Sequence, residues 1–489
     1  MKNKHIIFII FAVVTLIRLI YINYLPLLGD EAYYWQWARH LDWGYYEQGP
    51  VVALVIWIFT FFTKISTVFT IRLGSVILSL ATMIIMYFTY KRFRPTDKDD
   101  KENLINILLI NASLIYAIGA VLMMHDTVMV FFYSLFLYNL TYLIKEPIKN
   151  SYWCYAGILL GLGIMSKLTM GTTYLGIIVF LLLTGTFKKY LKGFLLLSLF
   201  TLIFSLPYIY WNFTHDFATV QYLLIRGGAT SPFTFKYFIE LLFSQIGLIS
   251  PLLIIIFIPA FIKNIKKPSF NLNFAFSTLF WASIIPFFIL SFKSRIEANW
   301  PIFAFLPLFF LTSEYLVSLK PKLFKIISFT VIFPSIILIT LAFTQAVKPI
   351  ITIPEKNNPL NKSYGYKELA TELDTIYTST PDKAKIFLAS RHYQMASLLS
   401  FYMSRQPYFH VLLKHESNKN YRFWNNTQAL NGQNCLFIYT EPWESWEMSE
   451  LFNKRIYTRE IDVALPGLSM RKYYIDYFEG LKQTKEIIK

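Results

Sequence analysis

Ionisable side chains that could carry out chemistry recur at a few places in a chain that otherwise avoids charge. Of its 489 residues, 55% are hydrophobic and only 15% are charged. Such groups cost free energy at membrane depth, so each is a candidate for function. The candidates come from separate stretches: Asp30, Glu31 and Glu47 in GDEAYYWQWARHLDWGYYEQGP, His125 and Asp126 in MMHDTVM, Lys167 in GLGIMSKLTM, His215 and Asp216 in YWNFTHDF, Arg226 in LIRGG, and Lys293 and Arg295 in FKSRIEANWP.

Two kinds of chemistry suit these residue types. The cations could neutralise a phosphate group through charge-assisted hydrogen bonds. The carboxylates could deprotonate an incoming hydroxyl group or hold a divalent metal ion. Together they predict a pocket for an anionic and partly apolar ligand, such as a phosphate head group on a lipid tail.

Several of these residues also have a purely structural interpretation. Asp30 stands where an Asp would cap the N-terminus of a helix, and Glu31 is favourable in the first helical turn. His125 and Asp126 could begin a helix near the water surface, and Lys167 could extend its ammonium group to that surface. Capping and catalysis do not exclude one another, so both interpretations stay open.

The remaining groups have structural alternatives as well. His215 and Asp216 could be ordinary loop residues, since a single His is more often structural than a ligand. Lys293 and Arg295 stand close to Glu297 in the sequence, where a surface ion pair would explain them. The aromatic residues of the first loop are typical of the interfacial belt of a membrane protein.

The elements that must position these residues are membrane helices, because a soluble domain carries about a quarter charged residues. The first apolar run follows Lys2 and Lys4 without a small-residue cleavage site, so we expect it to be retained. The apolar segment Val51–Phe62 is predicted to lie along the interface. We expect eleven membrane-spanning helices, at residues 5–24, 70–90, 104–120, 126–144, 152–167, 170–184, 193–210, 238–262, 274–291, 302–318 and 325–344.

The distribution of Lys and Arg predicts the orientation of these helices. Short cytoplasmic loops are rich in Lys and Arg, so the basic segments are predicted to be cytoplasmic. They are the N-terminus, KRFRPTDKDDKEN, KEPIKN, FKKYLK, KNIKKP and SLKPKLFK. The candidate residues then lie at the outer face of the cytoplasmic (inner) membrane. The net charge of +17 reflects these loops, and we expect no nucleic-acid partner.

The C-terminal part differs in composition from the rest of the chain. YGYKELATELDTIY and RHYQMASLLSFYM have helical patterns, whereas AKIFLAS and NCLFIYT are typical of short buried strands. The predicted fold is therefore a mainly α, polytopic helix bundle over residues 1–344. A small αβ soluble domain follows over residues 345–489, outside the cytoplasm.

Other types of site are not expected from this sequence. It contains neither a glycine-rich phosphate loop nor a dinucleotide fingerprint, so we expect no nucleotide cofactor. Cys154 lies in an apolar run and Cys435 in the C-terminal part. A disulfide framework or a cysteine metal site is therefore not expected either.

Taken together, the motifs resemble polytopic glycosyltransferases of the GT-C type. The resemblance is to the branch that includes bacterial aminoarabinose transferases acting on lipid A and relatives of dolichyl-phosphate-mannose protein mannosyltransferases. It covers about residues 25 to 425. It is carried by the first loop and by RLGSVIL, HDTVMVFF, GLGIMSKLT, WNFTHDF, EANWP, YGYKEL, FYMSRQP and YRFW.

The resemblance implies a membrane enzyme that moves a sugar, with inversion, from a polyprenyl-phosphate carrier to an acceptor. We expect the acceptor to be lipid A or another surface glycolipid, and the enzyme to be a monomer. It implies that Asp30 is a general base or positions the acceptor, and that Asp126 shares this work. Glu31 is a further catalytic candidate beside Asp30. The resemblance further implies that Lys167 and Arg226 bind phosphate and that Glu47 binds a divalent metal, with His215 as a second ligand. From their residue types and positions, Lys293 and Arg295 are further candidates for binding phosphate or another anionic part of the substrate.

The sequence departs from the family at one point. Relatives usually follow the position of Glu47 with a Lys or His and a pair of prolines, whereas this chain has Gln48, Gly49 and Pro50. Gln48 cannot supply a positive charge to phosphate. Both the metal site and the transfer of aminoarabinose in particular are therefore open.

Three other functions stay open. Protein O-mannosylation differs only in the acceptor. A transporter or flippase of lipid-linked sugar should show internal repeats and ionisable groups near the membrane midplane, whereas here the polar groups cluster towards one face. A non-catalytic assembly or receptor protein would not need acids and cations from several separate loops.

Overall fold

The chain consists of two compact units. The computed structural model describes residues 2–96, 100–227, 232–348, 350–351, 361–380, 385–412, 418–464 and 470–482. The first unit comprises Met1–Asn23, Leu41–Phe59 and Phe69–Phe343, and the second comprises Tyr24–His40, Thr60–Val68 and Thr344–Lys489. The second unit thus combines the C-terminal part with two short segments from near the N-terminus. As domain limits, residues 344 and 345 stay a prediction.

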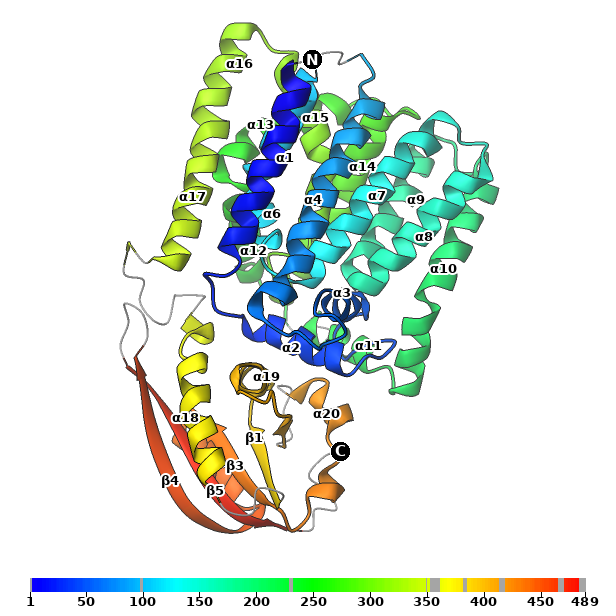
Figure 1. Cartoon of the computed structure of the whole chain (residues 1–489). Helices are drawn as coiled ribbons and strands as arrows, with labels where there is room; N and C mark the ends of the chain where they lie inside the picture. Colours follow the sequence, from blue (N-terminus) through cyan, green and yellow to red (C-terminus); the bar gives the residue numbers. More distant parts are fainter. Residues whose placement is uncertain are drawn as a thin grey trace. The chain divides into compact units, whose positions relative to one another are not determined.

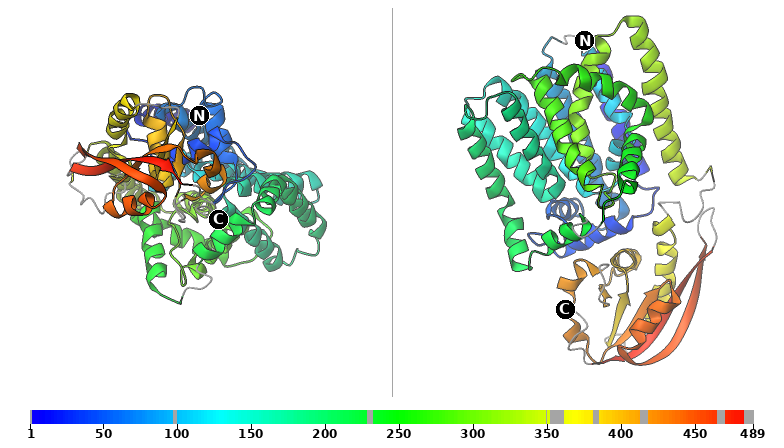
Figure 2. Two further views of the ribbon diagram at one scale, coloured as in Figure 1. Left: turned by 90° about the horizontal axis from the view of Figure 1, so that it is seen from below. Right: turned by 180° about the vertical axis from the view of Figure 1, so that it is seen from behind.

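The first unit is helical, and its long helices run side by side (Figures 1 and 2). Its α-helices are α1 (Lys2–Tyr21), α3 (Val51–Phe59), α4 (Val68–Phe93), α5 (Lys101–Asn111), α6 (Leu114–Gly119), α7 (His125–Lys145), α8 (Asn150–Ser166), α9 (Thr172–Leu183), α10 (Leu191–Thr214), α11 (Ala218–Arg226), α12 (Lys236–Ile249), α13 (Pro251–Ile265), α14 (Leu272–Leu290), α15 (Leu306–Val317), α16 (Pro321–Ile327) and α17 (Phe333–Val347). Tighter or wider turns connect some of them, namely η1 (Leu168–Gly171), η2 (Ile302–Phe305) and η3 (Ser328–Ile332).

Six helices of the described residues are long and apolar enough to cross a membrane, or seven if the bent pair α12–α13 forms one span. The six are α1, α4, α7, α10, α14 and the continuous helix from α16 through η3 to α17. The protein is thus a multi-pass membrane protein. Other predicted spans fall on shorter helices, such as α8 with 17 residues and α9 with 12. The count of eleven spans therefore stays a prediction.

One predicted span has a different shape from the one expected. The segment 238–262 is not a single straight helix, because α12 and α13 meet at 99°. The break lies at Ser250, whose φ is 135°, directly before Pro251. A proline disfavours helical backbone at the residue before it and is well suited to the first position of a new helix.

The short helix α3 agrees with the prediction for Val51–Phe62. Its nine residues measure about 14 Å along the axis, whereas the hydrocarbon core of a bilayer is about 30 Å thick. In Figure 1 it is seen nearly end-on, across the direction of the long helices. It is too short to cross the membrane, and its orientation suits a helix at the interface.

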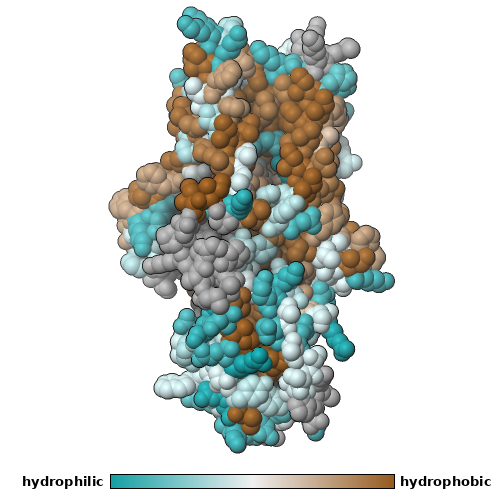
Figure 3. Space-filling model, turned by 60° about the vertical axis from the view of Figure 1, so that its left-hand side comes forward, coloured by the Kyte–Doolittle hydropathy of each residue, from teal (hydrophilic) through white to brown (hydrophobic). Residues whose placement is uncertain are grey.

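The outward faces of the long helices are apolar. On the face seen in Figure 3, apolar side chains form most of the surface of the helical unit. On α1, Leu16 is 59% exposed, and in η3 Phe329 is 75% exposed. Such faces are costly in water and suited to lipid.

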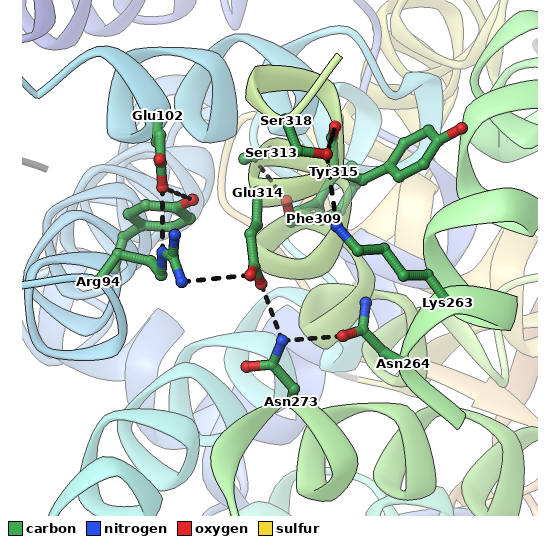
Figure 4. Close-up of polar contacts among 11 residues, drawn as sticks. Arg94, Glu102, Lys263, Asn264, Asn273, Phe309, Ser313, Glu314, Tyr315 and Ser318 are labelled. Carbon is green, nitrogen blue, oxygen red and sulfur yellow. Dashed lines mark hydrogen bonds and ion pairs between the residues drawn. The ribbon is translucent and has the colours of Figure 1, made fainter. Parts of the chain in front are cut away.

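A polar network joins the helix ends on the predicted cytoplasmic side (Figure 4). Arg94, just after α4, lies 3.3 Å from Glu102 of α5 and 3.2 Å from Glu314 of α15. Glu314 also accepts a hydrogen bond of 2.9 Å from Asn273 of α14, which in turn donates to Asn264 of α13. The carboxylate of Glu314 thus holds the ends of several helices together.

The second unit contains a five-stranded mixed sheet in the order β2-β1-β3-β5-β4. The parallel strands are β1 (Ile386–Ser390), β2 (Phe409–Val411) and β3 (Asn434–Tyr439), and the antiparallel pair is β4 (Phe452–Ala464) and β5 (Met470–Leu481). Its helices are α2 (Gly29–Arg39), α18 (Tyr366–Ser379), α19 (Tyr393–Tyr402), α20 (Tyr421–Trp424) and α21 (Pro442–Ser449), with short turns η5 (Asn361–Ser363) and η8 (Thr427–Leu430).

The prediction of a small αβ part at the C-terminus is confirmed. The two predicted helices correspond to α18 and α19, and the two predicted strands to β1 and β3. Residue 384, at the start of the first predicted strand, lies outside the described residues. The sequence analysis did not predict the long hairpin of β4 and β5.

Replacing Glu314 by Ala should destabilise the helical unit. The substitution leaves Arg94 and Asn273 without their shared acceptor, and hydrogen bonds to charged groups contribute about 1.5–3 kcal/mol each at partly buried sites. We expect a lower unfolding temperature of the full chain in detergent. Glu146→Ala is the control, since Glu146 forms an ion pair with Lys149 at an exposed helix end. Equal effects of the two substitutions would contradict the role of Glu314.

Candidate active site

Asp126 is the centre of a buried polar cluster in the first unit. Its Oδ1 atom lies 2.7 Å from Nζ of Lys167, and its Oδ2 atom accepts a hydrogen bond of 2.7 Å from the Asn299 amide. Asp126 is 8% exposed and Lys167 is 4% exposed. Two residues predicted separately, as an acid and as a phosphate-binding cation, thus form an ion pair.

Local structure explains why these three residues meet. Asp126 lies in the first turn of α7, where the helix dipole favours a carboxylate. Lys167 has extended backbone between α8 and η1, and its side chain leaves the helical path there. Asn299 belongs to the motif EANWP, in which no residue was predicted to be part of the site. His125 reinforces the contact, since its Nδ1 atom lies 3.1 Å from the carbonyl oxygen of Ser166.

Gln48 and Gly49 attach the first loop to the end of α8, beside Lys167. The Oε1 atom of Gln48 accepts a hydrogen bond of 3.2 Å from the backbone N–H of Leu168. A Cβ atom on Gly49 would lie 2.0 Å from the carbonyl oxygen of Met165, so only glycine permits this approach. The two residues that depart from the family pattern therefore hold the loop against the end of α8, next to Lys167.

A second polar chain begins at Glu47. Burial raises the pKa of the Tyr222 hydroxyl group, and the charges of Glu47 and Arg226 act on the same group. Arg226 lies 2.7 Å from Glu297, and both side chains are about half exposed. Because Glu297 is two residues from Asn299, this chain borders the Asp126 cluster. Tyr222 is a member that the sequence analysis missed.

Of the other two predicted cations, Arg295 lines a wider opening. Arg295 is exposed and lies 3.9 Å from Glu240 of α12, and Lys293 is exposed as well. A polar cleft of about 480 Å³ lies here, which is within the range for small-ligand sites. Its lining residues are Lys236, Tyr237, Glu240, Ser244, Arg295, Ile296, Glu297 and Ala298. These cations therefore lie near the cluster but outside it.

A smaller and mostly apolar cavity adjoins Asp126. Arg18 of α1 reaches its wall and donates a hydrogen bond of 2.9 Å to Asn111. The volume is about 40 Å³, which is enough for a few water molecules and too little for a lipid chain. Arg18 is a buried cation that the sequence analysis missed, although a single Arg in an apolar run is a visible signal.

The predicted metal ligands do not form a recognisable metal site. The ring of His215 stacks on Trp211 at 4.1 Å, and its Nδ1 atom lies 2.9 Å from the Trp211 carbonyl oxygen. Trp211 in turn donates a hydrogen bond to Asp42, and Asp216 lies in the turn that follows α10. Among the described residues, no group of three or more His, Cys, Asp or Glu side chains could hold a metal ion. The metal site stays a prediction.

In the second unit, Asp30 and Glu31 have different surroundings. The helix α2 begins at Gly29 with Leu28 as its N-cap, so of the two interpretations of Asp30 the capping one does not apply. Glu31 performs it instead, accepting a hydrogen bond of 3.1 Å from the Leu28 N–H. The Oδ1 atom of Asp30 accepts hydrogen bonds of 2.9 Å from Tyr393 and Gln394 of α19. Asp30 is thus held by the C-terminal part of the chain.

This chain is similar in sequence and in fold to known membrane proteins. Residues 47–211 match the family model of dolichyl-phosphate-mannose-protein mannosyltransferases. The solved structures of ArnT from Cupriavidus metallidurans, in the apo state and bound to undecaprenyl phosphate, align over 96% of this chain and 97% of theirs. Their TM-scores are 0.65 and 0.66, at 13% and 14% identity. The chain therefore has the fold of these ArnT structures.

A curated relative extends this comparison. Lipid A galacturonosyltransferase RgtD from Rhizobium johnstonii is 23% identical over 298 residues. The match covers 60% of this chain and 61% of RgtD, which is less than two thirds of that relative. The resemblance to GT-C glycosyltransferases predicted from the motifs is confirmed, and so is the fold at its coarser level.

The Asp126–Lys167 pair should be strongly coupled. Replacing Lys167 by Met leaves a buried carboxylate uncompensated, which typically costs about 3–5 kcal/mol. A double-mutant cycle with Asp126→Asn, measured by unfolding in detergent, should give a coupling energy above about 1 kcal/mol. The control cycle of Arg226→Met with Glu297→Gln, an exposed pair, should stay below that value. Similar coupling in both cycles would contradict the special position of Asp126.

Gly49→Ala should detach the first loop from α8. The new methyl group would overlap backbone atoms that cannot move aside, and overpacking of this kind costs about 1–3 kcal/mol. We expect a lower unfolding temperature and faster proteolysis near residue 49. The matched control is Gly247→Ala, because a Cβ atom there meets nothing within 4 Å. A Gly49→Ala protein as stable as the control would show that the loop is not attached in this way.

Proposed function

We propose that this protein is a membrane glycosyltransferase that moves a hexosyl or pentosyl group from a polyprenyl-phosphate carrier to lipid A or another surface glycolipid. The observation that carries the proposal is the buried cluster of Asp126, Lys167 and Asn299, joined by Gln48, in a chain with the ArnT fold. Two relatives support the substrate classes: ArnT has been solved with undecaprenyl phosphate, and RgtD is named for transfer to lipid A.

In the proposed reaction, Asp30 accepts the proton of an acceptor hydroxyl group as that oxygen attacks the anomeric carbon. A bond forms between this oxygen and the anomeric carbon. The bond between the anomeric carbon and the carrier phosphate oxygen breaks, and its electron pair leaves with the phosphate. Attack opposite the leaving group inverts the anomeric centre. Asp126 orients the reacting groups from its fixed position.

The cations have separate tasks in this proposal. The leaving phosphate gains negative charge, which preorganised donors stabilise most in a site with little water. Lys167 uses one of its three donors on Asp126, so two remain for phosphate oxygens. Arg226 is half exposed and could turn from Glu297 to the same group. Arg295 lines the polar cleft and Lys293 is exposed two residues before it, so both suit an anionic part of the acceptor.

The remaining predicted roles complete the proposal. Glu31 supports Asp30 through the helix cap. No step is assigned to a metal ion, because the ring of His215 is engaged with Trp211. We place the site and the C-terminal part on the outer side of the inner membrane, in accord with the basic segments on the other side, and we expect a monomer.

A second candidate is transfer to protein. It is favoured by the match of residues 47–211 to the protein mannosyltransferase model. The donor chemistry is the same in both cases. The two candidates therefore differ only in the molecule that carries the product.

Mass spectrometry of lipid A, surface glycans and membrane proteins can test the proposal. It should compare a strain lacking the gene with strains that carry the wild type, Asp30→Asn or the control Asp374→Asn. We expect one sugar to be missing from lipid A in the deletion and Asp30→Asn strains only. Asp374 is a suitable control because it accepts a backbone hydrogen bond at an exposed site.

Other outcomes would lead to other conclusions. Loss of the sugar from proteins would support the second candidate. An unchanged glycome with altered distribution of lipid-linked sugar would contradict transfer and favour transport. Full activity of Asp30→Asn would contradict the role of Asp30 as base.

A further inference from the structure

The two carboxylate oxygens of Asp30 have different surroundings. Oδ1 accepts hydrogen bonds of 2.9 Å from the Tyr393 hydroxyl group and from the Gln394 amide. In the parts of the chain that the structure describes, Oδ2 accepts none. Two donors on one oxygen fix the plane of the carboxylate and leave the other oxygen to face a ligand.

The donor Tyr393 is itself held by a cation. Nζ of Lys419 donates a hydrogen bond of 2.8 Å to the Tyr393 oxygen and lies 4.0 Å from the centre of its ring. A phenol whose oxygen accepts such a bond becomes a stronger donor, because successive hydrogen bonds polarise one another. The direction of the chain is therefore defined, from the Lys419 ammonium through Tyr393 to Asp30.

The position of Lys419 is also fixed from α2. The N–H of Asn420, the next residue, donates a hydrogen bond of 2.9 Å to the hydroxyl group of Tyr33. The rings of Tyr33 and Tyr393 meet edge to face at 4.6 Å. Helix α2, which carries Asp30, thus also positions Lys419, the cation that is linked to Asp30 through Tyr393.

Gly29 permits the close approach of α19 to α2. A Cβ atom on Gly29 would lie 2.8 Å from Cβ and 2.9 Å from Cγ of Gln394. These atoms are near the backbone and cannot swing away, as the end of a long side chain could. The contact between Gln394 and Asp30 therefore depends on the absence of a side chain at residue 29.

We propose that Tyr393, Gln394 and Lys419 are positioning residues that hold Oδ1 of Asp30, so that Oδ2 is the oxygen that accepts the proton of the acceptor hydroxyl. This inference rests on the proposed function and adds residues of the C-terminal part to the transfer step. None of the three touches the reacting atoms. The sequence resemblance assigns a role to none of them.

Steady-state kinetics of the full-length protein in nanodiscs can test the proposal. The donor is the polyprenyl-phosphate-linked form of the sugar missing from the deletion strain, and the acceptor is lipid extracted from that strain. We expect Tyr393→Phe to lower kcat at least about tenfold, with the KM for both substrates within about twofold, because orientation of a general base acts on the transition state.

The Lys419 variants separate charge from packing. Lys419→Met should lower kcat about three- to tenfold, and Lys419→Arg should restore most of it, since an Arg side chain also donates to the phenol oxygen. The controls are Tyr477→Phe and Lys472→Met on β5, which remove a hydroxyl group and an ammonium group elsewhere in the same unit. Both controls should keep wild-type kcat, and all variants should keep the wild-type unfolding temperature.

The outcomes distinguish this inference from the function on which it rests. If Asp30→Asn is inactive but Tyr393→Phe and Lys419→Met keep kcat within twofold, the inference is wrong and the function stands. A change in KM alone would also overturn it, because that would indicate a binding role. If Asp30→Asn is fully active, the assignment of Asp30 as base fails, whatever the other variants do.

Discussion

A carboxylate buried among membrane helices must be compensated by groups within the protein, and the compensation of Asp126 determines much of this site. The cation and the amide that face it come from segments far apart in the sequence, Lys167 and Asn299. Any movement of α7, of the end of α8 or of the EANWP segment would leave a buried charge without its partner. The same requirement that makes the site costly to build also makes it rigid, as a catalytic centre requires.

The departure from the family at Gln48 and Gly49 now has a physical explanation. In this chain the two residues attach the first loop to the end of α8. Gln48 accepts a hydrogen bond from the backbone N–H of Leu168, and Gly49 has no side chain that would collide with the backbone of Met165. A positive charge at this position is thereby lost. The proposal compensates for this loss with Lys167 and Arg226.

Part of this structure could be predicted from the sequence. Composition and apolar runs predicted the helical membrane unit, and helical and strand patterns predicted the elements α18, α19, β1 and β3. The break at Ser250 lies inside an apolar run, where hydropathy does not distinguish one straight helix from two bent ones. Residue types predicted which side chains were unusual, but their pairing depends on contacts between distant segments. The contacts of Asp30 with Tyr393 and Gln394 span more than 360 residues of sequence.

The composition of the second unit has a consequence for how this protein can be divided. Cleavage at the obvious composition change near residue 344 would separate Asp30 from the hydrogen-bond donors of α19 and leave α2 without its packing partner. A chimera that exchanged only the C-terminal part between relatives would mix an acid from one parent with donors from another. The transferable module is discontinuous: it contains Tyr24–His40 and Thr60–Val68 together with the C-terminal residues. Recombination between relatives with this fold would therefore preserve the contacts of Asp30 only if α2 and α19 come from the same parent.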